Sequence, residues 1–305
     1  MALTDDFSIT PLMGAFAAEV NGFDVAMAEQ ASVFERLEDA LHQYGVICIR
    51  DQQHLTPAKH VAFSRHFGDL EIHVQASFNL PGHPEIYCVS NCLDKQGKPR
   101  GLAEAGRVWH TDLSYKQAPS RCSLLHAIEV PRNAQEQALG ATKFASAAVA
   151  FERLDVDEQQ SLRQLHARHS YQAIYDKIVA MSKPGRQGLK PLSGAQKRAV
   201  EPAVHSVVIA HPRTGREILY VNHGTTERIL ELDAAASDTL VTRLCAHIIK
   251  PEQVYTHAWR EGDLLIWDNI QTQHLAVDDY WLPQRRHMQR TTVKGPVTQA
   301  AALSG

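Results

Sequence analysis

A histidine and an aspartate stand two positions apart in residues 108–115, which read VWHTDLSY. Alternate residues of a β-strand point to the same face of a sheet, so His110 and Asp112 on a strand would project side by side. A neutral imidazole beside a carboxylate suits a divalent metal ion of intermediate softness. The alternative is an ion pair at the end of a strand, which needs no metal.

The chain holds one other histidine that is followed two positions later by an acidic residue, His83 with Glu85. Chance accounts for such pairs in a chain with 17 histidines. Prolines on both sides of His83 favour a surface turn over a strand. We therefore keep His110 and Asp112 as the candidate pair.

A second histidine late in the chain would complete a metal site. Two histidines and one carboxylate on one face, with the other positions open, are the ligand set of non-haem Fe(II) oxygenases. A strand predicted over 264–267 runs into the turn residues Asp268 and Asn269, and a short strand after them carries His274. Arg286 follows twelve positions later, where its guanidinium could bind a substrate carboxylate through two hydrogen bonds.

The composition limits the classes of protein to consider. The 305 residues are 44% hydrophobic and 21% charged, and a net charge of −3 provides no basic surface for nucleic acid or a membrane. No apolar run approaches the ~20 residues that span a bilayer, and the acidic start of the chain lacks the pattern of a signal peptide. Five cysteines without a zinc-type pairing fit a reducing compartment. We expect a cytoplasmic protein.

The elements that must position these residues are mostly strands. We predict a single domain over 1–305, with a core from about 9 to 295 and a flexible tail over 296–305. The spacing of apolar residues predicts helices over 31–44, 57–67, 147–154, 157–166 and 234–249, and strands within 9–25 and over 46–49, 85–90, 123–130, 142–146, 204–210, 217–221, 254–259, 264–267 and 288–293.

Strands and helices do not alternate as in βαβ units, and no phosphate-binding glycine motif or internal repeat is present. The predicted fold class is α+β, mainly β, with antiparallel strands in a barrel-like or jelly-roll core and helices outside. The polar loop over 94–106 is either a lid over the site or an ordinary surface insertion. Residues 182–199 are predicted to form an exposed loop.

Together the motifs resemble a known family. They are Trp109-His-Thr-Asp112, Gly140-x-Thr142-x-Phe144, Trp267-Asp-Asn269, His274 and Arg285-Arg286-x-x-x-Arg290. In this order they resemble the taurine dioxygenase family of Fe(II)- and 2-oxoglutarate-dependent oxygenases, which includes 2,4-dichlorophenoxyacetate dioxygenase. The resemblance runs over about residues 9–295.

The resemblance implies a double-stranded β-helix (jelly-roll) core, Fe(II), 2-oxoglutarate and O2 as cofactor and co-substrates, and a homo-oligomer. It implies that a small molecule is hydroxylated while succinate and CO2 are released. Its site residues match these positions: metal ligands His110, Asp112 and His274; 2-oxoglutarate partners Thr142 and Arg286; substrate contacts Arg290 and His73.

The chain also departs from the family pattern. Ala141 replaces an acidic residue before Thr142, and Trp281 adds a residue between His274 and the arginines, so Arg285 is the alternative to Arg286. Residues 105–108 replace an asparagine-rich approach to the site, which argues against taurine as the substrate.

Each assignment has a structural alternative. Without metal, the three ligands would form a buried polar cluster. Thr142 could be a helix N-cap, Arg286 and Arg290 structural ion pairs, and His73 a loop histidine. Trp109 and Trp267 are expected to pack in the core or behind the ligands, and Asn269 to form hydrogen bonds within a turn. His169, Tyr171 and Tyr175 either line the site or pack a helix end, and Asn222 either reaches the cavity or ends a strand.

The sequence leaves three functions open. The first is a 2-oxoglutarate-dependent hydroxylase of a small anionic molecule, with Arg290, Arg107 and His73 as the reason for "anionic". Asp112 argues against halogenation, while desaturation stays open. The second is a zinc hydrolase with the same ligands, for which no motif supplies a general base. The third is a metal-binding barrel without catalysis.

Overall fold

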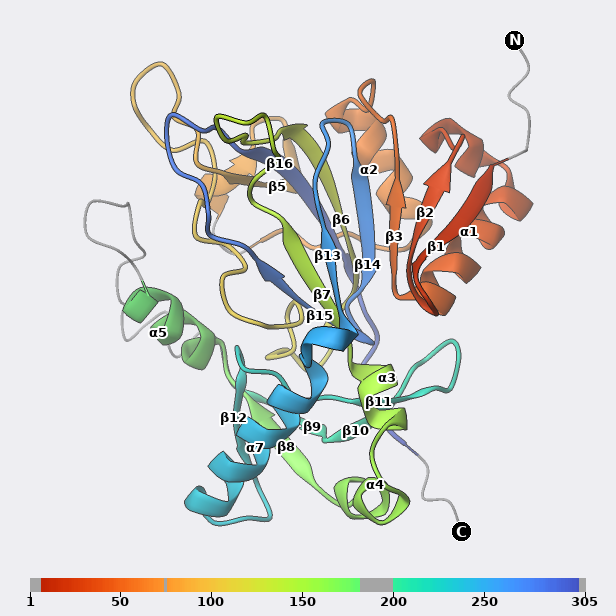
Figure 1. Cartoon of the computed structure of the whole chain (residues 1–305), viewed down its shortest axis with the longest axis vertical. Helices are drawn as coiled ribbons and strands as arrows, with labels where there is room; N and C mark the ends of the chain where they lie inside the picture. The colour runs from red at the N-terminus through yellow and green to blue at the C-terminus, as the bar shows by residue number, and fades with distance from the viewer. Residues whose placement is uncertain (1–6, 74–75, 182–199, 302–305) are drawn as a thin grey trace.

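The computed structural model describes residues 7–73, 76–181 and 200–301 (Figure 1). Four sheets and flanking helices make up these ranges. The largest sheet has eight strands in the order β1-β2-β3-β14-β6-β16-β5-β4. Its strands are β1 (Ser8–Met13), β2 (Phe16–Asn21), β3 (Val46–Ile49), β4 (Asn79–Leu80), β5 (His83–Ser90), β6 (Ser120–Glu129), β14 (Leu264–Asp268) and β16 (His287–Lys294).

The neighbours in this sheet pair antiparallel, except that β2 runs parallel to β3. Strand β14 lies inside the sheet and is buried on both faces. Successive side chains of a strand point to opposite faces, so Leu264 and Ile266 join the core beneath the helices, while Leu265 and Trp267 join a second core. A continuous apolar run is therefore what this strand requires.

A second sheet packs over that second core. It consists of β13 (Val254–His257), β7 (Thr142–Ser146) and β15 (Thr272–Ala276), all antiparallel, with β7 in the middle. Phe144 of β7 and Trp267 of β14 contact each other across the two sheets, with ring centroids 5.6 Å apart. The core between the two sheets ends at the candidate site.

Helices α1 (Ala31–Tyr44) and α2 (Pro57–His66) cover the outer face of the large sheet (Figure 1). A typical capping residue marks the C-terminal end of α1 and the N-terminal end of α2. Gly45 ends α1 in the left-handed region at φ 71°, and Thr56 caps α2 in front of Pro57 by accepting from the Lys59 amide. Both helices agree with the predicted ranges.

The lower part of Figure 1 holds two small sheets and further helices. The sheets are β11-β10-β17 and β12-β8-β9. Their strands are β8 (His166–His169), β9 (Ala203–Ser206), β10 (Val208–Ala210), β11 (Glu217–Leu219), β12 (Thr226–Ile229) and β17 (Gln299–Ala300), and the helices are α3 (Ala147–Glu152), α4 (Val156–Leu162), α5 (Tyr171–Met181) and α7 (Ala234–Ile248). The fold is thus mainly β, with mixed sheets and helices outside.

Several predicted elements differ from the structure. Residue His166 begins strand β8 instead of ending a helix, and the strand predicted over 204–210 is two strands that separate at Val207. His83 begins β5, because its turn ends at Gly82. Strand β17 pairs with β10 inside the stretch expected to be a tail.

The exposed loop predicted over 182–199 lies outside the described residues. Among the described helices, none is both long enough and apolar enough to cross a bilayer.

Candidate metal centre

Three predicted ligands come together in the interior. One ligand atom each of His110, Asp112 and His274 lies within 4.8 Å of the others, and all three residues are buried. His110 Nε2 lies 3.6 Å from Asp112 Oδ1. The two imidazole rings have centroids 4.2 Å apart.

The backbone explains how residues from distant parts of the chain meet. His110 forms an isolated antiparallel bridge to His274 of β15, with N–O distances of 3.2 and 2.8 Å in the two directions. The strand expected around His110 and Asp112 is reduced to this single bridge. Asp112 lies in a turn whose next residue, Leu113, has φ 61°, so the turn brings the carboxylate beside the imidazole. The prediction that alternation along a strand aligns the pair was therefore wrong.

The protonation states suit metal binding. His110 Nδ1 lies 2.7 Å from the Val108 carbonyl, which only accepts, so Nδ1 donates to it and Nε2 is the ring nitrogen directed towards Asp112. Burial raises the pKa of Asp112, but Arg290 and the two imidazoles outweigh it and hold this pKa well below the ordinary value. Burial and His110 hold the pKa of His274 well below its ordinary value, so its imidazole is neutral.

This donor set fits a divalent cation. His274 Nδ1 is buried and has no hydrogen-bond partner among the described residues. Buried polar atoms without partners are rare, so the three side chains are not a self-satisfied cluster. Two imidazoles with one ionised carboxylate are the borderline donors that Fe(II) and similar ions take.

A chain of hydrogen bonds orients the carboxylate from behind. Trp267 Nε1 donates to Asn269 Oδ1 (2.8 Å), Asn269 Nδ2 donates to Ser123 Oγ (2.9 Å), and Ser123 Oγ donates to Asp112 Oδ2 (2.7 Å). The Asn269 carbonyl also accepts from Thr111 Oγ1. The sequence predicted for Trp267 a packing role in the core or behind the ligands, and for Asn269 a turn hydrogen bond. It gave no signal for Ser123, which lies in a mostly apolar strand.

Thr142 and Arg286 are both buried, on neighbouring parts of the fold. Thr142 begins β7, and its Oγ1 accepts from Trp259 Nε1 at 3.0 Å; Ser146 is the residue that caps α3, so the N-cap alternative for Thr142 was wrong. Arg286 is 2% exposed, and its Nε has no partner among the described residues. Arg285 instead faces solvent and pairs with Glu129 at 2.7 Å.

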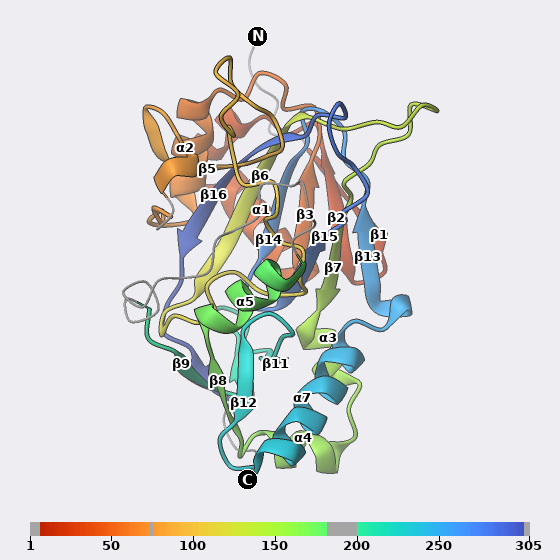
Figure 2. The ribbon, with the colours of Figure 1, turned by 90° about the vertical axis from the view of Figure 1, so that its left-hand side faces the viewer.

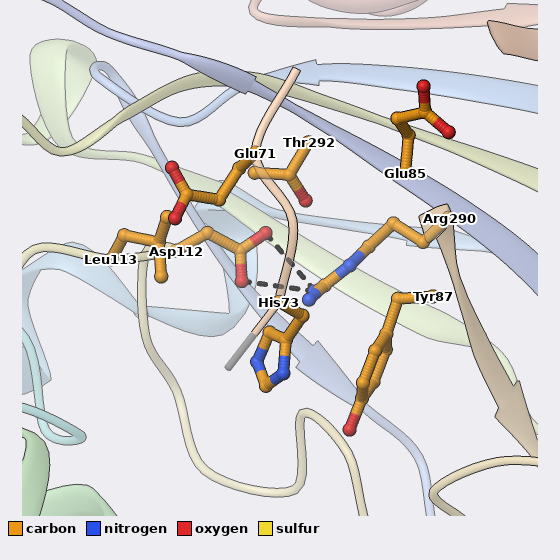
Figure 3. Close-up of a pocket in the computed structure, with 8 residues that line it drawn as sticks. All are labelled: Glu71, His73, Glu85, Tyr87, Asp112, Leu113, Arg290 and Thr292. Atoms are coloured by element: carbon orange, nitrogen blue, oxygen red, sulfur yellow. Dashed lines mark hydrogen bonds and ion pairs between the residues drawn. The ribbon is translucent and has the colours of Figure 1, made fainter. Parts of the chain in front are cut away.

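Arg290 and His73 line a cavity beside Asp112 (Figure 3). Arg290 of β16 donates through Nη1 to both Asp112 oxygens, at 3.1 and 3.2 Å. The His73 ring lies 4.2 Å from the Tyr87 ring, and burial together with Arg290 lowers the pKa of His73 to about 4. Figure 3 shows the Arg290 guanidinium directed at the carboxylate, with His73 and Tyr87 on one side.

Arg107, which contributed to the expectation of an anionic substrate, is engaged elsewhere. Its Nη1 pairs with Glu104 Oε2 at 2.8 Å and with Asp278 Oδ2 at 2.5 Å. Arg107 is also not among the residues that line the cavities beside Asp112. Its part in that expectation was wrong, and it acts as a structural cation.

Two further buried clusters of the described residues contain possible metal donors, His42–His211–Asp268 and Cys48–His257–Asp263. In both clusters the carboxylate accepts hydrogen bonds from neighbouring protein groups. The Nδ1 atom of His211 accepts from two backbone amides, so its Nε2 donates to Asp268. The Asp263 carboxylate accepts from Arg50, His257 and the Arg260 amide. In each cluster the carboxylate is therefore already engaged by protein hydrogen bonds.

A mainly β protein with two imidazoles and a carboxylate around one buried point is typical of non-haem metalloenzymes. The model of the family "Taurine catabolism dioxygenase TauD, TfdA family" matches residues 8–292. Pentalenolactone F synthase of Streptomyces avermitilis is 32% identical over 271 residues, covering 87% of each chain. The 2,4-dichlorophenoxyacetate dioxygenase of Cupriavidus pinatubonensis, described as alpha-ketoglutarate-dependent, is 30% identical over 92% of this chain and 96% of its own.

Two solved structures are also similar to this chain. A taurine dioxygenase from Burkholderia xenovorans has a TM-score of 0.76 at 27% identity, covering 96% of this chain and 90% of its own. AAD-2 in complex with Mn(II) and N-oxalylglycine has a TM-score of 0.78 at 26% identity, covering 97% and 100%. The chain belongs to the TauD/TfdA family, and it is a 2-oxoglutarate-dependent dioxygenase.

Proposed function

We propose that His110, Asp112 and His274 hold Fe(II), and that the enzyme hydroxylates a small anionic organic molecule with release of succinate and CO2. The observation that carries this proposal is the convergence of the three donors within 4.8 Å in a chain of this family. When bound, the iron with 2-oxoglutarate and O2 supplies the oxidation, and the protein supplies coordination, orientation and exclusion of water.

Thr142 and Arg286 are proposed to hold the far carboxylate of 2-oxoglutarate. The guanidinium of Arg286 is permanently charged and buried, so it requires an anion in that position. The Thr142 oxygen accepts from the Trp259 indole, which can only donate, so the threonine's own proton is directed to another acceptor. A carboxylate satisfies both residues.

Arg290 and His73 are proposed to receive the anionic end of the substrate. Arg290 uses one nitrogen for Asp112, and its Nε is buried without a partner among the described residues. Relatives named for anionic compounds support this assignment: an alkylsulfatase of Acinetobacter baylyi, a sulfonate dioxygenase of Saccharomyces cerevisiae and a sulfate ester dioxygenase of Pseudomonas putida.

The remaining proposals concern the whole molecule. The large sheet and the β13-β7-β15 sheet are proposed to form the two sides of a jelly roll, within a single domain of residues 1–305. A homo-oligomeric state and a cytoplasmic location stay predictions from the sequence.

Succinate formation tests the function. With Fe(II), 2-oxoglutarate and O2, the enzyme is expected to release succinate in step with oxidation of a carboxylic or sulfonic acid substrate. His110→Ala and His274→Ala are expected to abolish this turnover and the binding of Mn(II), an inert metal probe. His83→Ala, outside the cluster, is the matched control and is expected to retain both. Hydrolysis without O2 consumption would support the zinc hydrolase instead, and metal binding without turnover the non-catalytic barrel.

A further inference from the structure

One face of helix α5 lines the cavity that also contains two of the candidate metal ligands, His110 and Asp112. Tyr171, Ile174, Tyr175 and Ile178 stand at positions i, i+3, i+4 and i+7, which share one side of a helix, and all four line this cavity. Asp176, which is exposed, lies on another side of the helix. Figure 2 shows α5 crossing in front of the strands, between the large sheet and the small sheets.

Helix α5 lies very close to the metal ligand His110. A Cβ atom at Gly224 would lie 2.9 Å from His110 Cβ and 3.0 Å from Ile174 Cδ1, so a bare glycine backbone separates the two side chains. Lys177 Nζ donates to the His223 carbonyl and ties the helix to the same loop. The apolar face of α5 is therefore held beside the point where a substrate is oxidised.

The tyrosines form a continuous aromatic wall. The rings of Tyr115 and Tyr171 have centroids 4.9 Å apart with planes at 50°, and those of Tyr171 and Tyr175 are 5.7 Å apart at 56°. Tilted ring pairs at these distances attract one another, and tyrosine has few rotatable bonds, so the wall is rigid. Burial raises the pKa of Tyr115 and of Tyr175, so both hydroxyls stay neutral.

The ionised side chains among the described lining of this cavity lie at one end, and the acidic residues that line the adjoining cavity, Glu71 and Glu85, pair with Lys116 and Arg65. Among its described lining residues, the ionised side chains are Arg290 and Asp112, which contact each other. Asp112 is the proposed metal ligand, so it is not a partner for a substrate cation. The cavity thus offers one cationic end and a neutral aromatic wall.

We propose that the α5 face selects the body of the substrate, and that the preferred substrate is a monoanion whose uncharged body is a ring. This inference rests on the proposed function and adds specificity-determining residues, Tyr171 and Tyr175. A rigid ring loses less freedom than a flexible chain on binding a rigid wall. A substrate ammonium group would be desolvated there without a counter-charge.

Three matched ligands test the proposal by calorimetric binding to the protein loaded with Mn(II) and N-oxalylglycine. Nonanoate and 3-phenylpropanoate have the same carbon and oxygen count, and phenylalanine adds an ammonium group to the latter. We expect 3-phenylpropanoate to bind about tenfold more tightly than either of the others. Equal binding of the two acids, tighter binding of nonanoate or phenylalanine, or no binding of 3-phenylpropanoate would overturn the proposal.

Substitutions on α5 test whether this helix causes the preference for 3-phenylpropanoate over nonanoate. Tyr171→Ala and Tyr175→Ala are expected to weaken 3-phenylpropanoate about five- to tenfold and nonanoate less than about twofold, while Tyr175→Phe and Asp176→Asn keep the wild-type preference. Equal losses for both acids in the alanine variants would contradict the assignment to α5. Succinate release separates the two proposals: binding preference without succinate production overturns the proposed function alone, and succinate production without the preference overturns this inference alone.

Discussion

The hydroxyl group of Ser123 connects Asp112 to the interior of the protein. It donates to Asp112 Oδ2 and accepts from Asn269 Nδ2, and Asn269 is fixed in turn by Trp267. A carboxylate that loses such a bond keeps its charge but loses its orientation, and outer partners of this kind change metal affinity about 10- to 100-fold.

Ser123→Ala is therefore expected to weaken Mn(II) binding about tenfold while the fold stays intact, because only one hydrogen bond to the proposed ligand is removed. Calorimetric titration with Mn(II) measures the affinity. Ser120→Ala is the matched control, since Ser120 also accepts from Asn269 but does not contact Asp112. Equal affinities for the two variants would show that the hydrogen-bond chain does not support the ligand.

At this scale the sequence predicted part of the site. The spacing of His110 and Asp112 suggested a metal site, and the resemblance of the surrounding motifs to a known family led to the expectation that His274 joins them. Arg286 was distinguished from Arg285 only by its burial in the structure. Ser123 could not be found, because a serine within an apolar run carries no signal until its neighbours across two strands are known.

The segment that joins β15 to Arg286 connects several parts of the site. The Ala276 amide donates to the Gly106 carbonyl (2.8 Å), the Val277 amide to the Ala141 carbonyl (2.9 Å), and the Gly140 amide to Asp279 Oδ1 (2.7 Å). These bonds hold the loop before His110 and the loop before Thr142 against one segment.

The extra residue in this segment is accommodated at the surface. Trp281 is 61% exposed, so the insertion bulges outward and leaves Arg286 buried. Sequence alone could not decide between the two arginines, because the direction of a bulge depends on the space available on each side.

The ion pairs of Arg107 hold one of these loops. Arg107→Leu is expected to destabilise the protein by about 3 kcal/mol, because it removes the largely buried guanidinium that pairs with both Glu104 and Asp278. Chemical denaturation measures the loss. Arg65→Leu, which breaks the exposed pair with Glu85, is the control and is expected to cost less than about 1 kcal/mol. A cost for Arg107→Leu no larger than that of the control would refute the structural role.

The whole molecule carries buried neutral histidines that make its stability depend on pH. Burial lowers the pKa of His60 and of His169 to about 3. The unfolded chain binds protons on these residues below about pH 6.5, whereas the folded chain does not until about pH 3. Folding is therefore disfavoured as the pH falls through this window, by about 1.4 kcal/mol per pH unit for each such histidine.

His60→Gln is expected to reduce this slope between pH 5 and 6.5, a range above that in which carboxylates of lowered pKa begin to contribute. Urea denaturation at several pH values, with the metal content held constant, measures the slope. The exposed His54→Gln is the control. An unchanged slope in His60→Gln would mean that His60 is protonated in the folded protein.

The overall class of the fold was predictable because its central strands are long and apolar, as in 264–268 and 120–129. The two small sheets could not be predicted from the sequence. Strand β8 reads HARH and β12 reads TERI, and such short polar segments become strands only because they pair with each other and with β9. Helix α5 was not predicted as an element, although Tyr171 and Tyr175 were expected either to line the site or to pack a helix end, and both line the cavity.

The contact between α5 and His110 across Gly224 has a consequence for how such an enzyme can diversify. The proposed metal ligands are supported by β6, through Ser123, and by β15, which carries His274, whereas α5 is tied by Lys177 to the loop that contains His223. Under the proposed selectivity, exchanging side chains along that helix would alter which molecules are accepted without disturbing the reaction centre. Chemistry and selectivity can therefore be inherited separately, one with the sheets and the other with a single helix.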